Sequence, residues 1–320
     1  MRLAAAVHWY AEGRISRRRA EAIAGSERFA SALAVREATR ETVIRESGRA
    51  TYAVDLLGLP TIHRLAIDGR KIELEWKLHK ALETVAFLAL APDQRATKEA
   101  IVEAVWWEAG TDAVAKNFHP TLSYARRSLG DRTALVLRNG SYLLDPDLGW
   151  EVDALRFERL AAAGRDLVEP RLSAPGVPPE EEAGDPLSVD LAAATDRALE
   201  LWRRAWKLYR GPLMAGRESP WIVPRREELR RAYLRTLADL GRAAVLRGKD
   251  TLALDAYRSV LIEDPYAERI HLEMMTLYSR QGRRDLLRRQ YVRLQELLMR
   301  ELNEEPSDET QERYHRLMGK

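Results

Sequence analysis

The 320-residue chain contains no cysteine, and this absence removes several kinds of site at once. Without thiols there is no disulfide framework, no zinc–thiolate centre and no cysteine nucleophile. The six histidines form no close metal-ligand pair, and the sequence has neither a nucleophile-elbow pattern nor a phosphate-binding loop pattern. We therefore expect a protein that is not an enzyme and that uses no metal or other cofactor.

The chain also lacks a long apolar run. No stretch of about 18 apolar residues occurs, so no membrane-spanning helix is expected. The apolar start of the chain, residues 1–7, is too short for the core of a signal peptide. These two features predict a cytoplasmic protein with no membrane partner.

Charge is divided unevenly along the chain. Residues 1–150 hold 22 Lys and Arg against 19 Asp and Glu, whereas residues 151–320 hold 30 of each. Within residues 114–142, five basic side chains stand against one acid. A basic stripe on a nearly neutral chain is typical of a nucleic-acid contact, although charge alone fits a solvated surface equally well.

The apolar pattern predicts a mainly helical chain with a small amount of sheet. Residues 1–55 are expected to form a short helical N-terminal segment. A hairpin is predicted over 62–75, three helices over 77–91, 97–107 and 113–129, and a second hairpin over 133–144. Thr97 is the expected N-cap of the second helix, and Asn139-Gly140 the turn of the second hairpin. This order is that of a winged helix-turn-helix domain, which we place at residues 60–148.

The remainder, residues 150–320, is predicted to be all helical. Residues 169–190 are rich in proline and acid and are expected to form a flexible loop. Helices are expected over 191–208, 225–247, 251–263, 267–280, 284–302 and 308–318. Gly248 and Gly282 lie 34 residues apart, each in a turn between amphipathic helices, and this is the tetratricopeptide period.

Five stretches resemble the SARP-type bacterial transcriptional activators. They are KNFHPTLSYARRSLG at 116–130, NGSYLL at 139–144, VDALRFE at 152–158, YRGPL at 209–213 with WIVPRR at 221–226, and residues 288–307. Proteins of this type join an OmpR-like winged helix to a bacterial transcriptional activation domain with tetratricopeptide-like repeats. The resemblance covers residues 62–318 and implies an activator that binds specific promoter DNA and contacts RNA polymerase.

The third predicted helix of the winged domain is the expected DNA reader. A major groove admits one α-helix, whose first turns reach the base edges, and a wing can reach the neighbouring minor groove. The candidate DNA-binding residues are Lys116, Asn117, His119, Thr121, Ser123, Tyr124, Arg126 and Arg127 on the helix, and Arg138, Asn139 and Tyr142 on the wing. Pro120 fits a helix that becomes regular near Asn117, because proline is tolerated in a first turn.

The resemblance also implies a polymerase contact in the loop between the two helices of the helix-turn-helix. Its candidate residues are Trp106, Trp107, Glu108 and Asp112. One tryptophan is expected in the core and the other on the surface, and the sequence does not say which. The grooves of a repeat domain bind peptides or a second copy, so a homodimer, a polymerase contact and an effector response all stay open.

Two other functions remain as alternatives. The repeats alone would suit a protein–protein scaffold or adaptor, in which the winged helix binds no DNA. Residues 12–16, Glu-Gly-Arg-Ile-Ser, resemble the start of small antitoxin-type proteins, which suggests an autorepressor. The basic residues gathered at Lys116, Arg126, Arg127 and Arg138 favour the DNA-binding regulator, because a scaffold gives no reason to keep them together.

Overall fold

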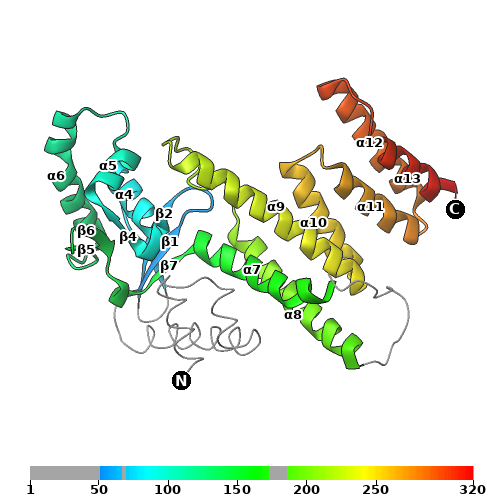
Figure 1. Ribbon diagram of the computed structural model, residues 1–320, viewed down its shortest axis with the longest axis horizontal. Helices are drawn as coiled ribbons and strands as arrows, with labels where there is room; N and C mark the ends of the chain where they lie inside the picture. The colour runs from blue at the N-terminus through cyan, green and yellow to red at the C-terminus, as the bar shows by residue number, and fades with distance from the viewer. Residues whose placement is uncertain (1–50, 67–69, 173–185, 320) are drawn as a thin grey trace. The chain divides into compact units, whose positions relative to one another are not determined.

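The computed structural model describes residues 51–66, 70–172 and 186–319 of the chain (Figure 1). The predicted helices of residues 1–50 and the middle of the predicted loop at 169–190 lie outside these ranges. The chain divides into two compact units. Of the described residues, the first unit holds those from Thr51 to Asp153 together with Met214–Val223, and the second holds those of Ala154–Leu213 and those from Pro224 onward.

The first unit opens with a four-stranded sheet. Its strands are β1 (Thr51–Asp55), β2 (Thr61–Leu65), β3 (Lys71–Glu73) and β7 (Trp150–Val152), in the order β3-β2-β1-β7. Strand β1 pairs antiparallel with β2 and parallel with β7, and its Val54 lies opposite Ile62 with both side chains fully buried. The expected boundary after residue 55 was therefore wrong, because β1 is an inner strand of this sheet and not part of a helical segment.

Three helices and a second sheet complete the first unit. The helices are α4 (His79–Leu90), α5 (Lys98–Val105) and α6 (Thr111–Leu129), and the sheet has the order β4 (Arg95–Thr97), β6 (Ser141–Leu144), β5 (Leu135–Arg138). Short 3-10 turns lie at Pro92–Gln94 and Pro146–Leu148. The Thr97 hydroxyl caps α5 by accepting a hydrogen bond from the Ala100 N–H at 3.3 Å. Asn139 and Gly140 have φ of 50° and 76°, as a two-residue hairpin turn requires.

Helix α6 begins six residues earlier than the expected regular start at Asn117. It runs from Thr111, so Pro120 lies in the middle of the helix and not in its first turn. Proline has no N–H, and the Lys116 carbonyl therefore receives no helical hydrogen bond from residue 120. Pro120 is exposed, so water can solvate that carbonyl, while Val114, Phe118 and Leu122 on the opposite face are buried.

The first unit also contains a segment that returns to it from later in the sequence, Met214–Val223, here called the returning segment. The Met214 N–H donates to the Leu56 carbonyl at 2.7 Å, and the Ala215 N–H donates to the Gly58 carbonyl at 2.9 Å. Trp221 Nε1 donates to Glu83 Oε1 at 3.1 Å, and the Trp221 ring packs edge-on against Phe87 with 5.2 Å between centroids. The predicted division at residues 148–150 places this segment in the other domain.

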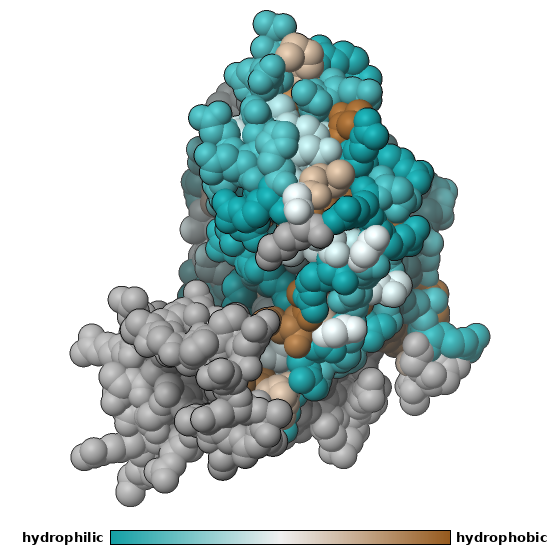
Figure 2. Space-filling model, turned by 90° about the vertical axis from the view of Figure 1, so that its right-hand side faces the viewer, coloured by the Kyte–Doolittle hydropathy of each residue, from teal (hydrophilic) through white to brown (hydrophobic). Residues whose placement is uncertain are grey.

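The described part of the second unit consists of helices and the loops between them. Its helices are α7 (Asp153–Leu172), α8 (Pro186–Leu208), α9 (Ile222–Leu246), α10 (Asp250–Glu263), α11 (Glu268–Arg280), α12 (Arg284–Leu302) and α13 (Asp308–Gly319). The predicted loop is therefore too long, because residues 169–172 and 186–190 are helical. The face of the C-terminal helices in Figure 2 is largely hydrophilic, with small separate apolar patches.

The two turns predicted from the glycine spacing have the same backbone structure. Gly248 and Gly282 have φ of 64° and 68°. The Lys249 N–H donates to the Ala244 carbonyl and the Arg283 N–H to the Tyr278 carbonyl, both at 2.8 Å. This pattern is the Schellman motif, in which a left-handed glycine ends a helix. The repetition of the motif after 34 residues supports the tetratricopeptide-like reading of this unit.

Candidate nucleic-acid interface

Helix α6 presents one polar face to solvent. Lys116, Asn117, His119, Ser123 and Arg127 are all exposed, and they share this face because an α-helix has 3.6 residues per turn. Neither Lys116 nor Arg127 forms an ion pair within the described part of the chain. These five residues, here called the α6 face, form a polar surface with two unneutralised cations.

Two predicted DNA contacts do not lie on this surface. The side chain of Thr121 is 3% exposed and that of Tyr142 is 5% exposed. Tyr142 packs edge-on against Phe118, with 5.4 Å between ring centroids. The assignment of Thr121 and Tyr142 to the DNA contact was therefore wrong, because both side chains are buried and do not lie on the exposed face of α6.

Tyr124 and Arg126 are half-buried and already hold parts of the unit together. The Tyr124 hydroxyl accepts a hydrogen bond from the Lys77 N–H at 2.9 Å, just before α4. Arg126 Nε donates to the Leu135 carbonyl at 2.7 Å and so ties α6 to strand β5 of the wing. Both residues thus position the α6 face and the wing, whatever further contact they make.

The tip of the wing is exposed, but its arginine has an acidic neighbour. Arg138 and Asn139 are exposed, and Arg138 Nη2 lies 3.7 Å from Asp145 Oδ2. Asp145 is buried, and its other carboxylate oxygen accepts a hydrogen bond from the Asp147 N–H at 3.1 Å. A phosphate that binds Arg138 therefore competes with a carboxylate that the fold holds in place.

Two basic residues near α6 were missing from the predicted site. Lys98 is exposed at the first position of α5, and its Nζ lies 5.4 Å from the centroid of the Phe118 ring. Arg132 is exposed just after α6, and no ion pair holds it within the described ranges. The N-cap at Thr97 was a signal for Lys98, because it fixes the next residue as the helix start.

The loop before α6 separates the two tryptophans. Trp106 is 6% exposed and packs against Phe118, with 5.6 Å between ring centroids. Trp107 is 47% exposed, and Glu108 and Asp112 beside it are also exposed. The core tryptophan is thus Trp106, while Trp107, Glu108 and Asp112 form an accessible acidic and aromatic surface.

The comparisons with known proteins give the second unit its family. Residues 186–318 match the family described as the bacterial transcriptional activator domain. This region is a bacterial transcriptional activator domain. With the winged-helix fold before it, the predicted SARP-type architecture is confirmed. Proteins with this domain are transcriptional regulators, which as a class are generally not enzymes.

A solved structure extends the similarity of fold beyond the activator domain. It is Mycobacterium tuberculosis EmbR in complex with a low affinity phosphopeptide, with a TM-score of 0.62 and 18% identity over 85% of the present chain. The match covers 65% of the EmbR chain. No curated protein matches the present sequence. At this identity the likeness concerns the fold alone.

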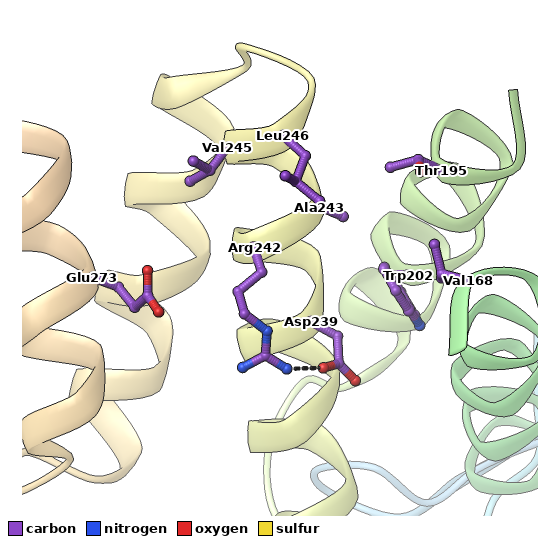
Figure 3. Close-up of a pocket in the computed structure, with 9 residues that line it drawn as sticks. All are labelled: Val168, Thr195, Trp202, Asp239, Arg242, Ala243, Val245, Leu246 and Glu273. Atoms are coloured by element: carbon purple, nitrogen blue, oxygen red, sulfur yellow. Dashed lines mark hydrogen bonds and ion pairs between the residues drawn. The ribbon is translucent and has the colours of Figure 1, made fainter. Parts of the chain in front are cut away.

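The second unit has an open cavity of about 280 Å³ between α7, α8, α9 and α11 (Figure 3). Val168, Trp202, Ala243 and Leu246 give it apolar walls, and Asp239 pairs with Arg242 at one side. Burial raises the pKa of Asp239, against the opposing effect of Arg242 and Arg165. The lining combines apolar walls with charges of both signs, so it does not point to one chemical class of ligand.

Other site types have little support. No group of three His, Cys, Asp or Glu side chains that could hold a metal ion occurs in residues 51–66, 70–172 and 186–319. Over the same ranges, no helix has the length and apolar character to cross a membrane.

Proposed function

We propose that the chain is a sequence-specific, DNA-binding transcription regulator. In this proposal the α6 face lies in the major groove, and Arg138 and Asn139 of the wing meet the flanking backbone. The carrying observation is that five exposed polar side chains, two of them unpaired cations, share one face of the second helix of a helix-turn-helix. A bacterial regulator must reach chromosomal DNA, which lies in the cytoplasm. We therefore include a cytoplasmic location in the proposal.

The two ends of the α6 face have different expected roles. Asn117 lies in the second turn of α6, and its Nδ2 donates to the Ala113 carbonyl at 2.8 Å, which leaves its side-chain oxygen free for a base. Arg127 lies near the C-terminus of α6, where a helix in the groove meets the backbone. Asn117 is therefore the expected base reader, and Arg127 the expected phosphate contact.

We expect Asn117→Ala to cost about 1–3 kcal/mol on a selected genomic site and to leave non-specific affinity nearly unchanged. Arg127→Ala should lower specific and non-specific affinity together, with a loss of about one counterion contact in the salt dependence. Fluorescence anisotropy with the selected site and with a duplex of unrelated sequence measures the specific and the non-specific affinity. Arg95→Ala is the matched control, because Arg95 is exposed in the same unit but pairs with Asp93 at 3.2 Å. Equal effects of both substitutions on both duplexes would contradict base reading by α6.

We further propose that activation proceeds through an RNA polymerase contact at Trp107, Glu108 and Asp112. Exposed tryptophans are frequent anchors of protein interfaces; Glu108 follows this one in the loop, and Asp112 lies in the first turn of α6. Trp107→Ala should reduce promoter transcription in a purified system at least fivefold and leave DNA affinity unchanged. A variant that activates like the parent chain would remove this contact from the proposal and leave DNA binding untouched.

A further inference from the structure

The turn between α11 and α12 gathers four arginines that have no acidic partner. Arg280 ends α11, Arg283 is the N-cap of α12, Arg284 is the first residue of α12, and Arg288 follows Arg284 by one helical turn. All four side chains are exposed, and none of them forms an ion pair within the part of the chain that the structure describes. We call these four residues the arginine turn. They are a local charge excess in a half of the chain whose formal charges cancel.

Eight other arginines in the described second unit have a carboxylate partner, whereas Arg203, Arg204 and several more are exposed without one but are not gathered at a turn between two helices. Each of Arg225, Arg230, Arg231, Arg242, Arg247, Arg258, Arg289 and Arg300 lies within ion-pair distance of a carboxylate. The equivalent turn 34 residues earlier is the closest comparison. There Arg247 and Lys249 both lie 2.8 Å from Asp196, whose pKa their hydrogen bonds lower to about 2. The arginine turn has the same backbone structure, but the acid beside it, Asp285, lies 2.8 Å from Arg289 and pairs with none of the four.

This arrangement costs free energy unless an anion balances it. Like charges at i and i+4 on a helix destabilise it, and Arg284 and Arg288 have this spacing. Each guanidinium offers a planar fork of donors that matches a phosphate group in a bidentate way. Four adjacent forks with no internal partner therefore suit a polyanion better than a single small ion.

The surroundings of the turn favour nucleic acid over an acidic protein. Protein interfaces are built around an apolar or aromatic core that becomes desolvated. Along the sequence from Tyr266 to Val292 the described chain exposes no large apolar side chain, and the nearest one on α12 is Val292, one turn after Arg288, at 36% exposed. A phosphate backbone needs charge and donors only, and these are what the turn provides.

We propose that the arginine turn binds the phosphate backbone of double-stranded DNA as an electrostatic contact separate from the α6 face. The inference rests on the proposed DNA-binding function and adds a second binding site to it. The contact supplies affinity without base reading, so it acts equally on all sequences and weakens steeply with salt.

The test is a salt titration of the full chain on a duplex of random sequence, followed by anisotropy. The variant R280Q/R283Q/R284Q/R288Q removes the four charges from exposed positions and keeps good helix formers. The matched control R231Q/R258Q/R289Q/R300Q removes the same charge from arginines of the same unit that are already paired. Log affinity against log salt should flatten by about 0.9 for each lost contact, hence by about 2–4 in the variant and by less than about 1 in the control.

The outcomes separate this inference from the proposed function. If the parent chain binds no DNA, the proposed function fails. If the parent chain binds but the variant and the control give the same slope, the arginine turn is not a DNA contact and only the further inference fails. A variant with unchanged DNA binding but reduced transcription would assign the turn to an acidic protein, which also overturns the inference.

Discussion

At the scale of single residues, His271 is the clearest case of a titratable group that the fold holds in one form. It is 1% exposed, its Nε2 lies 3.1 Å from the Pro265 carbonyl, and Gln290 Nε2 lies 2.8 Å from its Nδ1. With Nε2 as donor and Nδ1 as acceptor, both contacts are satisfied by a neutral ring. Burial lowers the pKa of His271, with the Pro265 hydrogen bond acting against it and Arg293 adding to it.

The sign of the resulting pH dependence follows from linkage. Because the folded pKa is below the ordinary value, the unfolded chain takes up the proton first as the pH falls. The neutral His271 ring contributes fully to the free energy of unfolding above about pH 6.5. This contribution is lost as the pH falls from there through the lowered pKa of the folded state. In the parent chain, His271 should change the free energy of unfolding by at most about 1.4 kcal/mol per pH unit between pH 7.5 and 5. We expect His271→Gln to remove this pH dependence, and urea unfolding over that range measures it. Parallel profiles for the parent chain and the variant would contradict the prediction.

The candidate site also shows which residue-scale features a sequence can and cannot supply. The polar face of α6 was predictable, since Lys116, Asn117 and Arg127 follow the helical period. The burial of Thr121 and Tyr142 was not, because it depends on how the wing packs against α6. The same packing decides between the two tryptophans, as Trp106 and not Trp107 meets Phe118.

At the scale of elements, the sequence predicts caps and turns correctly where neighbouring residues alone determine the backbone structure. The cap at Thr97, the turn at Asn139-Gly140 and the two glycine turns of the repeat were predicted from neighbouring residues and have the expected geometry. Each of these depends on a few atoms within one turn of chain, so a short sequence contains the whole cause.

Elements whose form depends on distant partners were harder to predict. Strand β1 is buried without a break from Tyr52 to its end at Asp55, so it lacks the alternation that marks a strand with one solvated face. Its partners β2 and β7 are respectively about ten and one hundred residues away. Helix α6 likewise begins at Thr111 in spite of Pro120, because the buried side chains Val114, Phe118 and Leu122 outweigh one missing backbone hydrogen bond.

At the scale of the whole molecule, the division into two units differs from the predicted one by a single returning segment. Composition and periodicity predicted a division near residue 150, and the chain does pass between units at Asp153–Ala154. The return of Met214–Val223 to the first unit has no local signal, because its contacts with Leu56, Gly58 and Glu83 join residues far apart in sequence. The winged-helix unit is thus completed by a segment from within the activator domain.

This completion predicts that the winged-helix unit is unstable when cut out at the boundary that the sequence suggests. A fragment of residues 51–153 lacks Trp221, which packs on Phe87 and donates to Glu83, and Glu83 is only 5% exposed. Loss of a large aromatic contact costs about 3–5 kcal/mol, and a buried carboxylate left without its donor adds to that cost. The matched control joins residues 213–224 to the same fragment through a flexible Gly/Ser linker. We expect the fragment to unfold at least about 3 kcal/mol more easily than this control in urea, with the difference reduced by Trp221→Ala in the control. If the two fragments unfold together, the returning segment only passes over the first unit, and residues 51–153 fold without it.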